Sequence, residues 1–252
     1  MNERFSEFIE ESPKLFVQGL FEQSTTEKQK LGTVRKLSDG RVFVYAKVGA
    51  VGLAAGKLCQ APVQVADHLN IAVASAAPIG ARKVTVTLGA TAATKDQYKD
   101  GFLYVNSGTG VGCAYKIKAH PAADASTFLK VSLYDRVRVA LATTSKVTLF
   151  SNPFNGTIVH PAPTTAALVG IPQIVVTAAY YYWSLVKGMT PCLIDGIPAI
   201  NDHLIPSDLV DGAVEVAVEV AAAASVVQRI GTVLNTGVDT EYKMIQLAIP
   251  GF

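Results

Sequence analysis

The sequence predicts a mainly β protein, with sandwich-like or barrel-like domains built from hairpins and an N-terminal arm that is helical or extended. Three observations support this fold class. Short runs alternate between apolar and polar residues, Asp-Gly pairs separate strand-forming runs, and the single Trp lies with three Tyr in residues 180–188. Alternation puts apolar side chains on one strand face, and Gly accepts the positive φ of a tight turn. Each aromatic ring buries ~150–250 Å², so residues 180–188 are expected to anchor a β core.

The composition favours extensive apolar burial. Half of the 252 residues are apolar and 17% are charged, whereas typical soluble domains carry about 25% charged residues. Such a chain buries surface within itself or against neighbouring subunits. The acidic N-terminus shows no signal peptide, and Pro172 and Gln173 interrupt the apolar run 166–186, so no membrane span is expected. The three Cys are widely spaced and are expected to be small buried hydrophobes.

Charge is unevenly distributed along the chain. Residues 1–150 carry 19 Lys/Arg and 12 Asp/Glu, a net charge of +7, whereas residues 151–252 carry 3 and 8, a net charge of −5. Halves of opposite sign would help copies to pack head to tail, or the basic half would face an acidic partner. Neither half shows a dense basic run with interleaved aromatic residues, so no nucleic-acid partner is expected.

Residues 1–30 are expected to form an N-terminal arm and linker. Residues 2–20 are amphipathic, with Glu between apolar residues, and residues 21–30 are polar. Two interpretations remain open: the arm docks on a neighbouring chain, or it packs as a helix on its own domain. The candidate subunit contacts in this arm are Phe5, Phe8, Leu15 and Phe16.

A first β domain is expected over residues 31–152. It opens with a hairpin of residues 33–37 and 41–48 around the turn 38–40, where Asp precedes Gly. The glycine-rich segment 107–112 is expected to be a hairpin turn, because a phosphate-binding loop needs a following helix N-terminus. The further predicted strands of this domain are 82–88, 101–106, 112–119, 129–133, 136–141 and 145–150.

A C-terminal β module is expected over residues 153–252, after the turn cluster 152–156. Residues 173–186 are expected to be a strand pair, with Gly188 as the turn. Because neighbouring Tyr alternate faces, the exposed side of the cluster is the candidate subunit contact, carried by Tyr180 and Tyr182. The further predicted strands are 191–194, 197–200, 213–220, 229–235 and 242–249.

No catalytic, cofactor-binding or metal-ligating constellation is predicted. The four His are remote in sequence from one another and from the Cys residues, so no metal-ligand spacing is present. The pairs Asp67-His68 and Asp202-His203 are adjacent, but neighbours on a strand point to opposite faces. There is no Gly-x-Ser-x-Gly nucleophile elbow. The sequence therefore favours a protein that is not an enzyme.

Five segments of the C-terminal module carry a pattern of apolar and Gly positions: Tyr182-x-x-Leu185-x-x-Gly188, Cys192-Leu193-Ile194-Asp195-Gly196, Ser207-x-x-x-x-Gly212-Ala213-Val214, Ile230-Gly231-Thr232-Val233-Leu234 and Tyr242-Lys243-Met244-Ile245-Gln246-Leu247. In these segments the module resembles the head decoration (capsid cement) proteins of tailed phages, small β domains rich in Ala, Gly and Val. The likeness covers residues 170–250 and, more loosely, 31–60. It implies a virion structural protein, assembled in the host cytoplasm, that binds the lattice of the major capsid protein as a homo-oligomer, with a trimer favoured.

Two other functions stay open at this point. A tail, fibre or receptor-binding component of the virion would use a surface loop to meet a host molecule, without the capsid. A β-fold hydrolase would need acidic residues or His gathered in one pocket.

Overall fold

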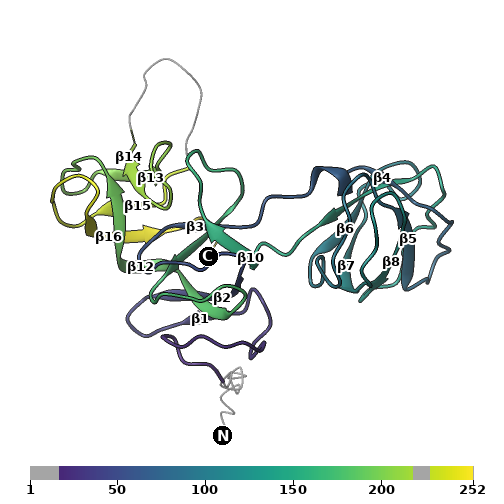
Figure 1. Cartoon of the computed structure of the whole chain (residues 1–252), viewed down its shortest axis with the longest axis horizontal. Coiled ribbons are helices and arrows are strands. Elements are labelled where there is room, and N and C mark those ends of the chain that lie inside the picture. Colours follow the sequence, from purple (N-terminus) through teal and green to yellow (C-terminus); the bar gives the residue numbers. More distant parts are fainter. Residues whose placement is uncertain (1–16, 218–227, 252) are drawn as a thin grey trace, which may run out of the picture.

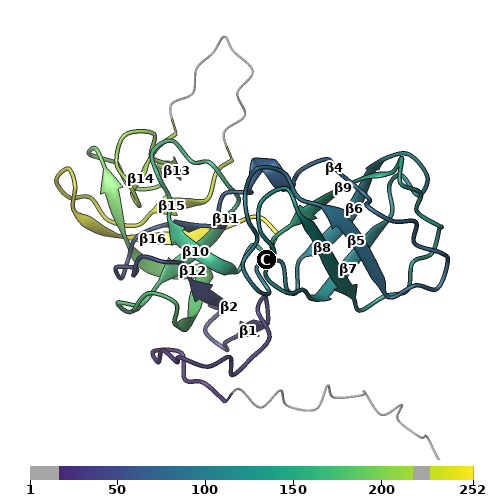
Figure 2. The same cartoon turned by 45° about the vertical axis from the view of Figure 1, so that its right-hand side comes forward.

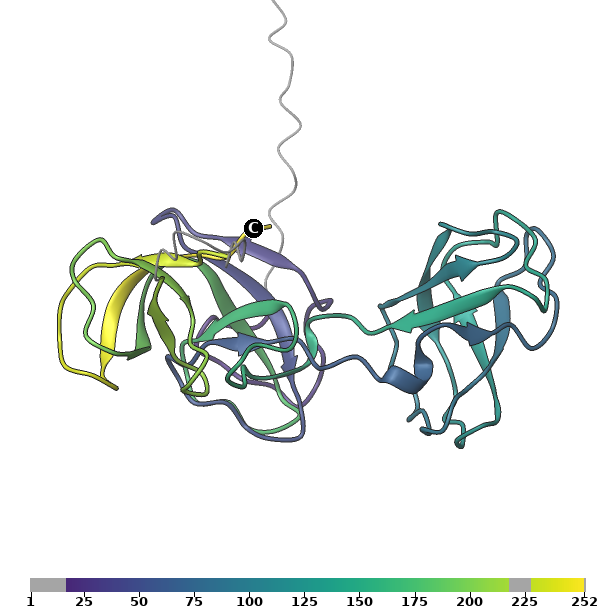
Figure 3. The same ribbon diagram turned by 90° about the horizontal axis from the view of Figure 1, so that it is seen from above.

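The computed structural model describes residues 17–217 and 228–251, and it is mainly β, as the sequence predicts. Its strands form a ten-stranded sheet and a six-stranded sheet. The two sheets lie in separate lobes, and the chain crosses between them twice, after β3 and after β9 (Figure 1). We call residues 17–61, 155–217 and 228–251 the sheet lobe and residues 66–150 the barrel lobe. The view from above shows the same division (Figure 3).

The sheet lobe contains strands from both ends of the chain. Their order across the sheet is β1-β2-β10-β3-β11-β12-β14-β13-β15-β16. The strands are β1 (Val34–Lys36), β2 (Val42–Val48), β3 (Cys59–Gln60), β10 (Asn155–Val159), β11 (Leu168–Pro172), β12 (Tyr181–Asp195), β13 (His203–Pro206), β14 (Val214–Val216), β15 (Gly231–Val233) and β16 (Tyr242–Ala248).

The barrel lobe is one closed antiparallel sheet in the order β4-β9-β6-β7-β8-β5. A bridge between Val73 and Val86 joins its two edges, so the sheet closes on itself. Alternate residues of each strand, such as Leu103 and Ile117, point inward and form a buried core. The elements are β4 (Ile71–Ala72), β5 (Lys83–Thr87), β6 (Phe102–Ser107), β7 (Ala114–Ala119), β8 (Phe128–Leu133), β9 (Lys146–Phe150) and the short 3₁₀ helix η1 (Ala66–His68).

Strand β12 organises the sheet lobe, and residues 180–188 supply its first half. β12 pairs with β2 along this half and with β16 along the other half. Trp183 and Leu185 face one core, whereas Tyr182 faces a second core on the opposite side. Both faces are covered, so the aromatic strand is a core strand as predicted. The predicted turn at Gly188 is wrong, because β12 continues through this residue to Asp195.

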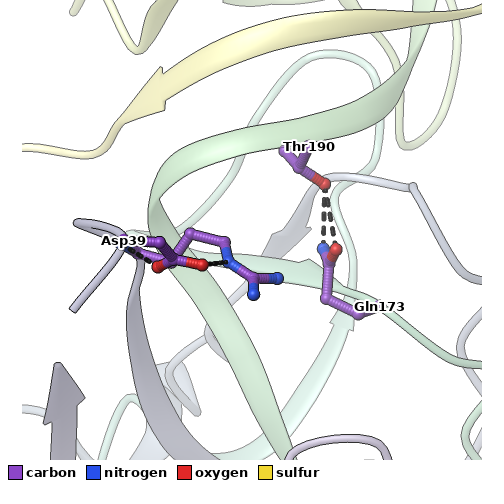
Figure 4. Close-up of polar contacts among 4 residues, drawn as sticks. Asp39, Gln173 and Thr190 are labelled. Carbon is purple, nitrogen blue, oxygen red and sulfur yellow. Dashed lines mark hydrogen bonds and ion pairs between the residues drawn. The ribbon is translucent and has the colours of Figure 1, made fainter. Parts of the chain in front are cut away.

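The predicted turn at residues 38–40 is confirmed. The Leu37 N–H donates to the Arg41 carbonyl oxygen at 2.9 Å, and Gly40 has a φ of +86°. Asp39 accepts from both the backbone N–H and the Nε of Arg41, at 3.0 and 2.7 Å, and these bonds hold the pKa of Asp39 below its ordinary value. Figure 4 shows this turn beside the amide–hydroxyl pair of Gln173 and Thr190, which links the end of β11 to β12.

The predicted domain division needs a correction. The boundary at 152/153 falls where the barrel ends, but residues 31–60 belong to the sheet lobe, so the barrel is an insertion between β3 and β10. The reason is the pairing of Tyr45 with Trp183, which joins segments remote in sequence and leaves no local signal. Predicted strands at 136–141 and 197–200 are wrong as well, since both are loops. The predicted strand 213–220 is shorter (β14), and its last three residues lie outside the described residues.

Candidate interaction surfaces

The candidate contact residues of the sequence analysis are placed differently by the structure. Tyr182 is 0% exposed, and its hydroxyl lies 3.1 Å from the Thr157 Oγ1. It is therefore a core residue and not a subunit contact, and burial raises its pKa above the ordinary value. Tyr180 is half-buried beside the same core. Phe5, Phe8, Leu15 and Phe16 lie outside the described residues.

The described chain begins with a segment that is firmly attached to β12. Gln18 is 2% exposed, and its amide donates to the carbonyl oxygens of Glu22 and Tyr181 at 2.8 and 3.0 Å. Its side-chain oxygen accepts from the Tyr45 hydroxyl at 2.6 Å, and its backbone carbonyl accepts from the Trp183 indole at 3.1 Å. This anchor fixes the start of the described chain beside the aromatic half of β12.

Three of the four His are buried and hydrogen-bonded within the fold. His68 pairs with the Tyr98 hydroxyl and, at 2.9 Å, with the Thr91 carbonyl oxygen. His120 accepts from the Tyr98 N–H at 3.0 Å, and burial lowers its pKa. The two ring nitrogens of His160 lie 2.9 and 2.7 Å from backbone carbonyl oxygens. The three rings therefore join segments that lie between the strands.

The two Asp-His pairs are also accounted for. Asp67 accepts from the Thr91 hydroxyl at 2.6 Å instead of facing His68. Asp202 accepts from the Ala199 N–H at 2.7 Å, and its neighbour His203 is exposed. Over residues 17–217 and 228–251, no three His, Cys, Asp or Glu side chains gather as a metal site. In the same ranges, no helix has the length and apolar character needed to cross a bilayer.

A cleft of about 440 Å³ lies where the two lobes meet. The sheet lobe contributes Glu27, Lys47 and Tyr181 to its wall, and the barrel contributes the loop 94–100. Lys99 Nζ lies 3.4 Å from Glu27 Oε2 across the junction. Burial lowers the pKa of Lys99, but the charges of Glu27 and other acidic neighbours outweigh it and raise the pKa. Lysines and carboxylates alternate around this wall, so it does not select a ligand of one charge.

The outer side of the barrel carries a row of exposed aromatic residues. Phe150 lies opposite Phe102 across β9 and β6, and Phe102 lies opposite Lys116 across β6 and β7. The Tyr134 N–H donates to the Lys116 carbonyl oxygen at 2.9 Å, so the residue that follows β8 continues the row beside β7. Exposed fractions are 45% for Phe102, 38% for Tyr134, 37% for Tyr104 and 36% for Phe150. We define the barrel face as these four aromatic residues together with Lys116, Lys118 and Arg138.

The barrel face brings basic and aromatic residues side by side in space. They are separate in sequence, and the sheet registers bring them together. Two Asp adjoin this surface. Asp135 Oδ2 accepts from the Lys116 N–H at 3.4 Å. Asp100 lies beside the Tyr134 hydroxyl, and burial together with Asp100 raises the pKa of Tyr134. The barrel lobe still carries ten Lys/Arg against five Asp/Glu, a net charge of +5 over residues 66–150.

A second exposed apolar surface lies at the end of the sheet lobe that is remote from the barrel. The Gly196 N–H donates to Asp239 Oδ1 at 2.6 Å, which brings the loops 196–202 and 234–241 together. Ile197 and Val238 on these loops are 76% and 66% exposed. We define the acidic end by its apolar residues Ile197, Ile200, Leu234, Val238, Tyr242 and Met244 and its acidic residues Asp202, Asp239 and Glu241.

The acidic end has almost no compensating positive charge. Lys243, the basic residue between Glu241 and Met244, is 1% exposed and donates to the Val238 carbonyl oxygen beneath the loop. Glu241 accepts from the Val238 N–H at 3.1 Å, yet its side chain remains exposed. The two surfaces are thus both partly apolar, but they have opposite signs of charge.

Comparison with protein families, curated proteins and solved structures gives no match to this chain. The fold defines a mainly β protein with two lobes, each of which presents an apolar and charged surface. Sequence reasoning missed both surfaces. Alternation indicates which residues of a strand point outward, but it does not indicate which strands are neighbours.

Proposed function

We propose that this chain is a virion structural protein of the head decoration (capsid cement) class, which binds and stabilises the lattice of the major capsid protein. The observation that carries the proposal is the pair of exposed apolar surfaces on separate lobes. Monomeric proteins rarely expose large apolar patches without a partner. A two-lobed molecule with a partner surface on each lobe is suited to linking subunits of a shell.

The resemblance to phage decoration proteins supports the same proposal. Its segments fall on β12, β14, β15 and β16, and these strands are neighbours in one sheet. The β12–β16 pairing runs from Lys187–Ala248 to Leu193–Tyr242 without a break. The segments therefore share one structural unit, the half of the sheet lobe that ends in the acidic end.

The mechanism of such a protein is burial of apolar surface between subunits. Burial stabilises by roughly 25 cal/mol per Å², and a stable interface buries about 800 Å² on each partner. In this mechanism, the N-terminal arm would add Phe5, Phe8, Leu15 and Phe16 to the apolar surface that is buried against the shell. The hydrogen bonds of Gln18 would then connect the shell-bound arm to the β12 core.

Binding to empty shells tests this function. Purified protein should co-sediment with shells of the major capsid protein, saturate at a fixed ratio and raise the temperature at which the shells disassemble. Deleting residues 2–16 keeps the Gln18 anchor and should weaken shell binding while the circular dichroism spectrum stays unchanged. Wild-type protein that leaves shells unbound and unstabilised would contradict the proposal.

The exposed aromatic row of the barrel face favours one alternative, a tail, fibre or receptor-binding component. Aromatic rings on a β surface stack on sugars as well as on protein side chains. This alternative predicts that the isolated protein binds host cells or surface glycans in the absence of shells, and that Phe102→Ala abolishes this binding.

A further inference from the structure

We infer that the barrel face of one copy docks on the acidic end of a second copy, so that the protein assembles head to tail. The inference rests on the proposed function only in taking both surfaces as assembly surfaces. It adds which surface meets which, and that the partner is the same chain.

Charge complementarity is the first argument for this partner. The barrel face presents Lys116, Lys118 and Arg138 around exposed aromatic rings. The acidic end presents Asp239 and Glu241 around exposed aliphatic side chains. Opposite charges across an interface speed encounter and fix its register, and aromatic residues with Arg are typical of interface cores.

The placement of the two surfaces is the second argument. The start of β16 and the loop before it lie at the end of the sheet lobe that points away from the barrel, in each of the views (Figures 1, 2 and 3). The two surfaces of one chain therefore cannot meet each other, so a contact between them joins two chains. Such a contact uses different surfaces on its two sides, and it closes into a ring when the rotation between copies allows.

The basic side chains of the barrel face are exposed on the outward side of the sheet. Lys116 and Lys118 lie on the outward side of β7, with Tyr115 and Ile117 turned into the core between them. Arg138 donates to the Ala114 carbonyl oxygen at 2.9 Å and covers the Tyr115 ring at 4.9 Å, which holds its charge beside β7. The aromatic row and the charges thus share one rigid sheet surface.

Charge reversal in the full-length chain tests the pairing. Purified wild-type protein should self-associate in sedimentation velocity at roughly 0.1 M salt. This association should weaken near about 1 M salt, where charges are screened beyond ~3 Å. Lys116→Glu with Lys118→Glu should weaken association at least about 100-fold, and Asp239→Lys with Glu241→Lys should do the same. A chain that carries all four substitutions should associate again, because both signs are exchanged.

Two further measurements keep the result unambiguous. Asp239 holds the Gly196 loop, so Ile197→Glu with Val238→Glu serves as a second variant of the acidic end that leaves this bond intact. It should also abolish association, and it should keep the wild-type melting temperature, as should Lys116→Glu with Lys118→Glu. A wild-type protein that stays monomeric, or a fourfold variant that does not recover, would overturn the inference.

The same experiment separates other partners. A monomer that binds a single-stranded oligonucleotide through Phe102 and Lys116 would assign the barrel face to nucleic acid and overturn self-docking. A monomer that still binds shells would leave the proposed function standing without head-to-tail docking. Self-association without shell binding would support head-to-tail docking and contradict the proposed function.

Discussion

Gln18 is the residue on which the attachment of the N-terminal segment depends most directly. Its side chain makes three hydrogen bonds in a buried site where water does not replace them. Gln18→Leu should lower the free energy of unfolding by about 1–3 kcal/mol. Urea titration measures this loss, and limited proteolysis should show earlier cleavage near residue 20.

The exposed Gln246 on β16 provides the matched control for Gln18. Gln246→Leu should change the unfolding free energy by no more than about 0.5 kcal/mol. Equal behaviour of the two variants would show that Gln18 does not anchor the segment.

Tyr182 makes the fold sensitive to alkali. Burial raises its pKa above the ordinary value of 10.0, so the folded state favours the neutral phenol. Below pH 10 both states are neutral and stability is unaffected, whereas above it the unfolded state ionises first and stability falls. Tyr182→Phe should therefore lose less stability between neutral pH and pH about 11 than the wild type. Urea midpoints at the two pH values measure it, and Tyr104→Phe on the exposed barrel face should behave as wild type.

At the scale of elements, the close packing of β11 against β12 sets a tight constraint. Gly170 has a φ of +132°, and a Cβ there would lie 2.4 Å from the Leu185 carbonyl oxygen. Gly170→Ala should cost more than about 3 kcal/mol, because backbone strain adds to the clash. Gly196 also has a positive φ, of +87°, but faces open space. Gly196→Ala should cost only about 1 kcal/mol in the same urea titration, and equal losses would refute the close approach.

The elements themselves could largely be predicted from the sequence. Alternation located β5, β6, β7 and β9, and Asp-Gly located the turn at Gly40, because these signals are local. The continuation of β12 through Gly188 could not be predicted, since a Gly after an aromatic run is compatible with a turn as well as with a continuing strand. Nor was the loop at 136–141, whose residues Val137 and Leu141 are buried without belonging to a strand.

At the scale of the whole molecule, the two lobes have separate cores. The barrel core contains only residues of the barrel lobe, and the three other buried clusters belong to the sheet lobe. Two unfolding transitions are therefore expected in calorimetry. Leu103→Ala should lower only the barrel transition, and Leu185→Ala only the other, each by about 2–5 kcal/mol. A single transition that shifts with both variants would show that the lobes unfold together.

The insertion of the barrel and the two surfaces belong to this largest scale, and the sequence did not predict them. β2 must be known to pair with β12 before residues 31–60 can be assigned to the sheet lobe. The barrel face likewise requires the registers of β6 with β7 and β9. Long-range pairing decides both, and one sequence carries no local signal for it. The uneven charge of the two halves was visible, but not the surfaces on which the charges gather.

The most direct test of the proposed function is a cryo-electron microscopy map of assembled particles that contain this chain. The proposal predicts that the two β lobes occupy a repeated site on the outside of the icosahedral shell, with residues 1–16 against a neighbouring subunit. Absence of the chain from every repeated site of the shell, or its presence only in the tail, would contradict the proposal.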